Sequence, residues 1–81
     1  MKLLTKKQRG RLIRTRRVEL GVTQEELATR MRCAQSHISY LERGMRGASR
    51  EDLNQLSRHL NLPLPALIFE REPRAKASRA A

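Results

Sequence analysis

The sequence predicts an all-α fold, a compact bundle of five short helices in one domain. Apolar residues recur at helical spacing in five segments, and residues that cap or end helices stand between these segments. The composition agrees, because 38% of the residues are hydrophobic but only 2% are aromatic, whereas strands favour β-branched and aromatic residues. A chain of 81 residues has room for a single hydrophobic core.

The first helix is predicted over about residues 6–20. This segment is rich in helix formers, and Leu12, Ile13 and Leu20 recur at helical spacing. Gly21 follows at the place where a left-handed residue commonly ends a helix. We expect residues 1–5, which precede this helix, to be a flexible N-terminus.

The second and third helices are predicted on either side of a short turn. Thr23 and Glu26 form a capping-box pattern, so a second helix begins directly after Thr23 and runs to about residues 31–32. A third helix is predicted over about residues 35–43, and Gly44 ends it. Two helices joined by so short a turn lie close together and cross.

The last two helices follow a second capping pattern. Ser49 and Asp52 predict the start of a fourth helix, which Asn61 ends in a left-handed conformation. Its inner face carries Leu53, Leu56 and Leu60. After two prolines, the apolar run at residues 66–69 predicts a short fifth helix. The folded domain is therefore expected to span residues 6–70, and residues 71–81 read as a disordered basic tail.

The charge of the chain favours a polyanionic partner. There are 18 Lys and Arg against 8 Asp and Glu, a formal net charge of +10. Nucleic acid, an acidic membrane or an acidic protein would each fit, and a solvated basic face with no specific partner is the plain alternative. No apolar run approaches the length of a membrane helix and no signal peptide is apparent, so we expect a cytoplasmic protein without membrane contact.

Two stretches of the chain carry a family resemblance. The segment LGVTQEELATRMRCAQSHISYLERG, residues 20–44, resembles the Cro and phage-repressor helix-turn-helix family, also called the XRE family. The stretch SREDLNQLSRHLNLPLPAL, residues 49–67, continues the resemblance through the last two helices. The resemblance implies a bacterial or phage-encoded, nucleoid-associated transcriptional regulator that binds double-stranded DNA. Its second and third helices would form the helix-turn-helix.

The resemblance also implies roles for individual residues. Positions that read base edges match Gln35, Ser36 and Tyr40. Positions at the DNA backbone match Arg14, Thr23, Gln24, His37, Ser39, Arg43 and Arg46. An internal salt bridge matches Arg17 and Glu42. For His37 a partly buried surface position is an equal alternative, and Tyr40 could simply pack on its neighbours.

The turn before the third helix departs from the family pattern. Arg32 stands where the family prefers Gly, and a left-handed Arg costs roughly 1 kcal/mol. Ala34 stands where Ser or Thr usually caps the third helix, which costs about 1 kcal/mol. His37 replaces a small residue common at that position. The resemblance therefore leaves the exact pose of the third helix open.

The apolar residues near the C-terminal end predict a homodimer. Leu64, Leu67, Ile68 and Phe69 are many for so short a segment, and an exposed apolar patch usually marks an interface. A two-fold dimer would place two third helices about one DNA turn apart, roughly 34 Å, over an inverted repeat. RNA polymerase or a cognate regulatory protein is a further possible partner.

Other chemistry has little support in the sequence. It holds no Ser-His-Asp set, carboxylate pair or phosphate loop, so an enzyme is not expected. Cys33 and His37 stand four apart, but two ligands make a weak metal site, and no cofactor is expected. Two hypotheses compete with specific DNA binding: a protein-interaction adaptor that keeps the fold, and a nonspecific nucleoid-type binder driven by charge.

Overall fold

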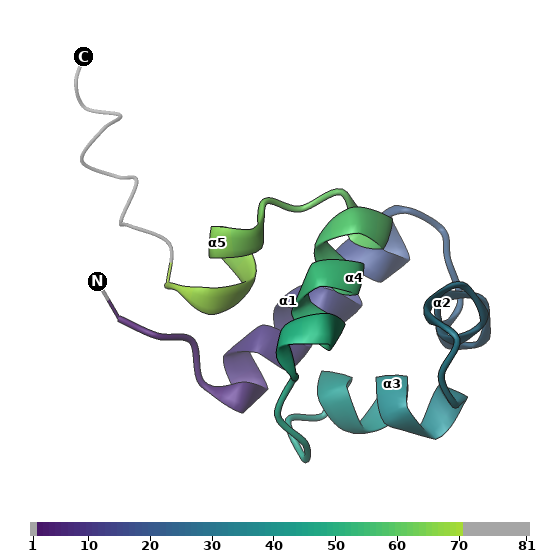
Figure 1. Ribbon diagram of the computed structural model, residues 1–81, viewed down its shortest axis with the longest axis horizontal. Coiled ribbons are helices and arrows are strands. Elements are labelled where there is room, and N and C mark those ends of the chain that lie inside the picture. Colours follow the sequence, from purple (N-terminus) through teal and green to yellow (C-terminus); the bar gives the residue numbers. More distant parts are fainter. Residues whose placement is uncertain (1, 71–81) are drawn as a thin grey trace.

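The computed structural model describes residues 2–70, and these form five α-helices without a named strand (Figure 1). In chain order they are α1 Lys6–Glu19, α2 Gln24–Met31, α3 Gln35–Glu42, α4 Arg50–Leu60 and α5 Leu64–Ile68. The predicted all-α, five-helix architecture is thus confirmed. Among these helices none combines the length and the apolar character that crossing a bilayer requires.

Reciprocal capping boxes begin three of the helices. At α2 the Thr23 hydroxyl accepts from the Glu26 N–H at 3.0 Å, and the Glu26 carboxylate accepts from the Thr23 N–H at 2.9 Å. Ser49 and Asp52 make the same pair of bonds at α4. The third box, between Thr5 and Gln8 at α1, has the same spacing of residues in the sequence.

The turn between α2 and α3 has the two features that the sequence indicates. Arg32 is left-handed, with φ 57° and ψ 46°, although a side chain makes this conformation unfavourable. Ala34 occupies the N-cap of α3 with extended backbone and provides no side-chain hydrogen bond. Both features are unfavourable for the free energy of folding, and both lie in the turn that sets the angle between α2 and α3.

The hydrophobic core draws on all five helices. Its buried members are Ile13, Leu27, Ala28, Met31, Ile38, Leu41, Leu56, Leu60 and Leu67. Full burial of one Leu or Ile side chain contributes about 1.5–3 kcal/mol, so this cluster is the main source of stability in a chain without a disulfide. At the crossing of α1 and α3 there is no room for a side chain at Gly10. A β-carbon there would overlap the backbone carbonyl oxygens of Leu41 and Glu42.

Two arginines on α1 donate hydrogen bonds to backbone carbonyls at the C-terminal ends of α4 and α5. Arg16 Nε donates to the carbonyl of Leu60 at 2.9 Å, and Arg9 Nε donates to the carbonyl of Leu67 at 2.7 Å. Both carbonyls lie at helix C-terminal ends, where a cation also meets the negative pole of the helix dipole. Arg9 and Arg16 therefore contribute to the stability of the fold.

The start of the chain is paired with its C-terminal side, where the sequence predicts a frayed end. Leu4 N–H donates to the carbonyl of Ile68 at 2.9 Å, and Glu70 N–H donates to the carbonyl of Lys2 at 2.8 Å. Leu3 and Phe69 form an antiparallel bridge between these bonds. Figure 1 shows the first residues running beside the end of α5. The flexible N-terminus expected for residues 1–5 stays a prediction, but Lys2 and Leu4 have backbone partners at Glu70 and Ile68, far along the chain, where no local pattern could indicate them. The predicted tail, residues 71–81, lies outside the described residues.

The structure also corrects one of the four predicted dimer contacts. Leu67 is 0% exposed and belongs to the core, so it is unavailable to a partner. The sequence showed a run of apolar residues but not which side of α5 faces inward. Leu64, Ile68 and Phe69 are half-buried and keep part of their surface accessible.

Candidate nucleic-acid interface

Helix α3 lies at the edge of the molecule and presents a polar face to solvent. Figure 1 shows it along the lower edge, with α2 beside it. Ile38, Leu41 and Glu42 point inward and are buried, while Gln35 and Ser36 are exposed. Close approach of α2 is possible because Ala28, which is 3% exposed, has only a methyl group. The stretch from Gln35 to Leu41 contains no acidic residue, which suits an element that meets phosphates.

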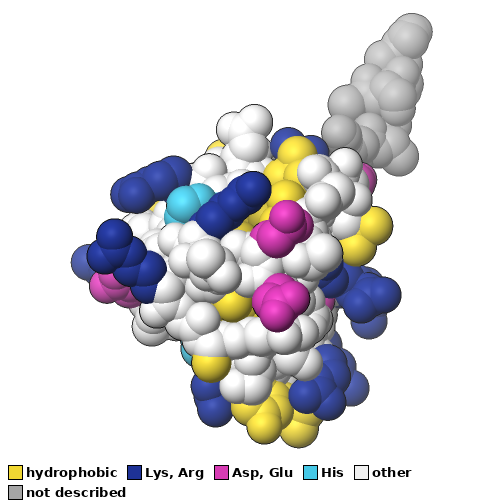
Figure 2. All heavy atoms as spheres, turned by 90° about the vertical axis from the view of Figure 1, so that its right-hand side faces the viewer, with side chains coloured by type: hydrophobic (Ala, Val, Ile, Leu, Met, Phe, Trp, Pro, Cys, Tyr) yellow, Lys and Arg dark blue, Asp and Glu magenta, His cyan; other side chains and the backbone are white. Residues whose placement is uncertain are grey.

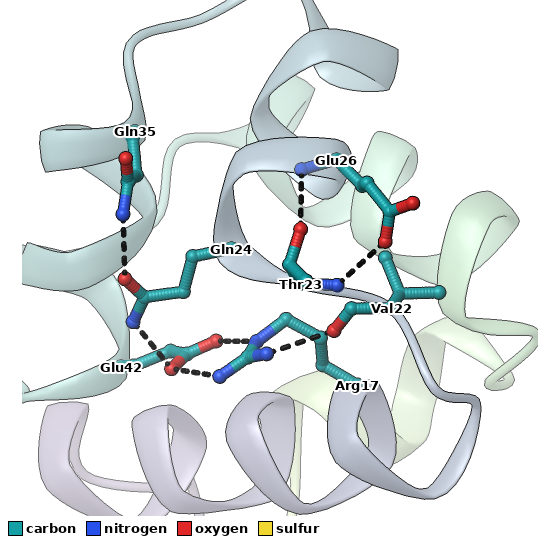
Figure 3. Close-up of polar contacts among 7 residues, drawn as sticks. All are labelled: Arg17, Val22, Thr23, Gln24, Glu26, Gln35 and Glu42. Carbon is teal, nitrogen blue, oxygen red and sulfur yellow. Dashed lines mark hydrogen bonds and ion pairs between the residues drawn. The ribbon is translucent and has the colours of Figure 1, made fainter.

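A buried ion pair joins α1 to the end of α3 (Figure 3). Arg17 donates to Glu42 through two nitrogens, Nε to Oε2 at 2.6 Å and Nη2 to Oε1 at 3.1 Å. Arg17 Nη1 also donates to the carbonyl of Val22, just before α2, at 2.8 Å. This is the pair that the family resemblance implies. Because the guanidinium bonds to both segments, it fixes α1, α3 and the start of α2 relative to one another.

Two glutamine amides continue this network to the surface. Gln24 Nε2 donates to Glu42 Oε1 at 3.0 Å, and Gln35 Nε2 donates to Gln24 Oε1 at 3.3 Å (Figure 3). The buried carboxylate therefore determines which way the Gln24 amide points, and Gln24 determines the orientation of Gln35. In this orientation the Gln35 carbonyl oxygen and its second amide hydrogen are left for an outside partner, the pair of groups that adenine matches in the major groove.

Two guanidinium groups lie near the Tyr40 ring toward the other end of α3. The Arg46 guanidinium carbon is 4.7 Å from the ring centroid and that of Arg43 is 5.4 Å away, within the range of cation–π attraction. Arg46 also reaches His37, with 2.9 Å between Nη1 and Nδ1. The sequence pattern contains no signal for these contacts, because they join a helix to the loop that follows it.

Three further predicted residues are Arg14, Thr23 and Ser39. Arg14 is exposed on α1, Ser39 is half-buried on α3, and Thr23 is exposed with its hydroxyl engaged in the α2 capping box. The backbone N–H of Thr23 is the main cause that lowers the pKa of Glu26. Figure 2, which faces the α2 side, shows Lys and Arg side chains mainly toward the rim of the view, including its lower, α3 edge, while acidic side chains lie near the middle and at the left rim.

The structure offers no support for a metal at Cys33 and His37. Within residues 2–70 there is no group of three His, Cys, Asp or Glu side chains that could hold an ion. Burial, with a smaller contribution from the charge of Asp52, raises the pKa of the Cys33 thiol. Such a thiol stays protonated at neutral pH, which suits a small packing residue in the turn.

Comparison with known proteins assigns the fold to a family. Residues 13–67 match a helix-turn-helix family model, whereas no curated protein sequence matches the chain. The clp gene regulator ClgR from Corynebacterium glutamicum has a similar structure, with TM-score 0.72 and 31% identity over 79% of this chain and 83% of that one.

Two further solved structures are similar. The restriction-modification controller protein C.AhdI from Aeromonas hydrophila has TM-score 0.69 and 28% identity over 78% of this chain and 92% of its own. The P22 c2 repressor, solved in complex with a synthetic operator, has TM-score 0.70 and 30% identity over 73% of this chain and 89% of its own. The matched segment contains the whole α2–α3 unit with its fixed glutamines. The chain therefore belongs to the Cro and phage-repressor type helix-turn-helix family of DNA-binding transcriptional regulators.

Proposed function

We propose that the chain represses or autoregulates transcription by binding an inverted-repeat operator in double-stranded DNA as a homodimer. The observation that carries the proposal is the exposed amide of Gln35, held by Gln24 on the acid-free face of α3. A base-reading side chain needs such a fixed orientation, since an amide free to rotate discriminates poorly between donors and acceptors.

Two kinds of contact would contribute to DNA binding, one to affinity and one to sequence discrimination. Arg14, Gln24, Ser39, Arg43 and Arg46 would contact phosphates and supply salt-dependent affinity by releasing counterions. Gln35, Ser36 and Tyr40 would supply discrimination, at about 1–3 kcal/mol for a good bidentate base contact. Because Tyr40 also stacks with two arginines, its contribution would include holding these cations beside the groove.

The similar proteins support a regulatory output of this kind. One is described as a gene regulator, one as a restriction-modification controller and one as a repressor on its operator. A dimer that covers an operator would block RNA polymerase, and repression needs no further activity from so small a chain.

Selection of binding sites from a pool of random double-stranded DNA at physiological salt tests the proposal. We expect an enriched inverted repeat with half-sites roughly 34 Å apart. Binding at low salt without any enrichment would instead indicate a nonspecific binder. No binding at either salt concentration would favour a protein-interaction adaptor.

A further inference from the structure

Asp52 connects the start of α4 to α3. Its Oδ2 accepts from the Ser49 N–H at 3.0 Å, and its Oδ1 lies 3.1 Å from Nε2 of His37. Partial burial alone would raise the pKa of the Asp52 carboxyl, but donors from Ser49 and His37 outweigh burial and hold this pKa below its ordinary value. The carboxylate is therefore charged at neutral pH, and the capping box fixes its position.

The two nitrogens of His37 must have different roles. An Arg side chain has only donors, so Nδ1, which lies 2.9 Å from Arg46 Nη1, accepts that hydrogen bond. A charged imidazolium has a hydrogen on both nitrogens and could not accept, so the ring is neutral in this arrangement. The single ring hydrogen is then on Nε2, where it donates to Asp52. His37 is only one-fifth exposed, and both of its polar atoms are engaged inside the protein.

Arg46 is thereby held on two sides. Tyr40 lies 4.7 Å from its guanidinium and His37 accepts one of its hydrogens, although Arg46 itself is exposed in the loop between α3 and α4. Arginine loses much rotamer freedom when it is ordered, so a side chain fixed in advance binds a phosphate at lower entropic cost. Its other guanidinium hydrogens remain for that phosphate.

We propose that His37 is a positioning residue, which holds Arg46 for a DNA phosphate through Nδ1 while Asp52 fixes the ring through Nε2. This inference rests on the proposed function and deepens it. It differs from a direct contact of His37 with the DNA backbone, because the ring has no polar atom left to offer. Residues that support phosphate binding would then include Asp52 at the start of α4 as well as residues of α3.

Two substitutions separate the two hydrogen bonds of the ring. In His37→Gln the amide nitrogen can stand near the place of Nε2 and donate to Asp52, but the acceptor for Arg46 is lost. In His37→Asn the amide oxygen stands near the place of Nδ1 and can accept from Arg46, but Asp52 is out of reach. If His37 positions Arg46, His37→Gln weakens binding to the selected duplex roughly tenfold, as expected for a charge-assisted hydrogen bond. His37→Asn, which keeps the acceptor for Arg46 but loses the bond to Asp52, should weaken binding less than His37→Gln does.

A double-mutant cycle with Arg46→Ala supplies the decisive comparison. Once Arg46 is truncated, His37→Gln should cause no further loss of affinity. Independent losses that multiply would show that His37 contacts the DNA itself and would overturn the proposal. Equal losses of affinity in both His37 variants, together with equal falls in Tm, would reduce His37 to a packing role and would also overturn it.

Ordering of Arg46 can be measured without DNA. In ¹⁵N NMR of the free chain, we expect slowed rotation of the Arg46 guanidinium in the unmodified protein and in His37→Asn, and fast rotation in His37→Gln. Equal rotation in all three would contradict the inference. If the unmodified chain binds no duplex at all, the proposed function fails, and this NMR comparison still decides whether His37 holds Arg46.

Discussion

At the scale of the residue, substitution of Gln35 should reduce the preference for the operator sequence with little effect on the fold or on binding to unrelated DNA. Gln35→Ala removes an exposed amide that bonds only to Gln24 among the described residues, so the fold should be unaffected. We expect the affinity for the selected operator to fall by about 1–3 kcal/mol, while binding to unrelated DNA stays nearly constant. Competition binding against operators substituted one base pair at a time measures the difference.

A glutamine elsewhere on the surface gives the control for this experiment. Gln55 lies on α4, where it bonds to Glu51, and Gln55→Ala should leave both affinities unchanged. A uniform fall on all sequences in Gln35→Ala would assign Gln35 to the backbone contacts instead.

Glu42 is the residue whose loss should cost the most stability. Glu42→Ala leaves the buried Arg17 guanidinium without its bidentate partner, and breaking one side of such a pair typically costs about 3–5 kcal/mol. Urea unfolding measures the change. The matched control is Glu19→Ala, because the Glu19 side chain is 59% exposed and surface pairs contribute about 0–1 kcal/mol. Similar losses of unfolding free energy in the two variants would show that burial does not make the Arg17–Glu42 pair more important for stability than a surface pair.

At the scale of the element, the approach of α1 to α3 depends on the absence of a side chain. In an isolated helix Gly→Ala would gain about 1 kcal/mol, because Ala is the better helix former. In Gly10→Ala the new β-carbon would meet the backbone carbonyls of Leu41 and Glu42, which cannot move aside without displacing α3. We therefore expect a fall in Tm and weaker operator binding, both measurable on the same sample.

Gly47 provides the matched control for the helix crossing. A β-carbon at Gly47 would stand 3.6 Å from the Lys6 side chain, an ordinary contact, so Gly47→Ala should leave Tm nearly unchanged. A stabilised Gly10→Ala variant would contradict the close packing of α1 on α3.

Element boundaries could be predicted from the sequence because their causes are local. The capping boxes at Thr23 and Ser49 and the left-handed Asn61 act within a few residues, and the helices begin and end there. Contacts between elements have no such local signal. The burial of Leu67 and the bonds of His37 depend on which faces meet after folding. In the candidate site, family resemblance gave the residues, but only the structure showed how Glu42 orients Gln24 and, through it, Gln35.

At the scale of the whole molecule, the proposed homodimer requires a surface on which two copies can meet. The pairing of the chain start with the segment after α5 brings Leu3, which is 66% exposed, to the same end as Phe69. Leu64 and Ile68 line a groove beside α4. These side chains are accessible apolar surface, and Figure 1 shows α5 on the upper left of the molecule, away from α3 along its lower edge. A dimer formed here would leave both α3 helices available for DNA.

If the proposed dimer forms through this surface, Ile68→Asp should convert it into a folded monomer, because a carboxylate would be desolvated in the contact. Sedimentation analysis should show the smaller species, and the affinity for the inverted repeat should fall by about 10²–10⁴-fold, since binding of the two half-sites is no longer linked. Affinity for a single half-site should stay the same, because α2 and α3 are untouched. Val18→Asp, at an exposed apolar position near the end of α1, is the matched control and should remain dimeric. If Ile68→Asp still sedimented as a dimer, or if Val18→Asp became the monomer, the contact would lie elsewhere, and the spacing of the two α3 helices on DNA would have to follow from that other surface.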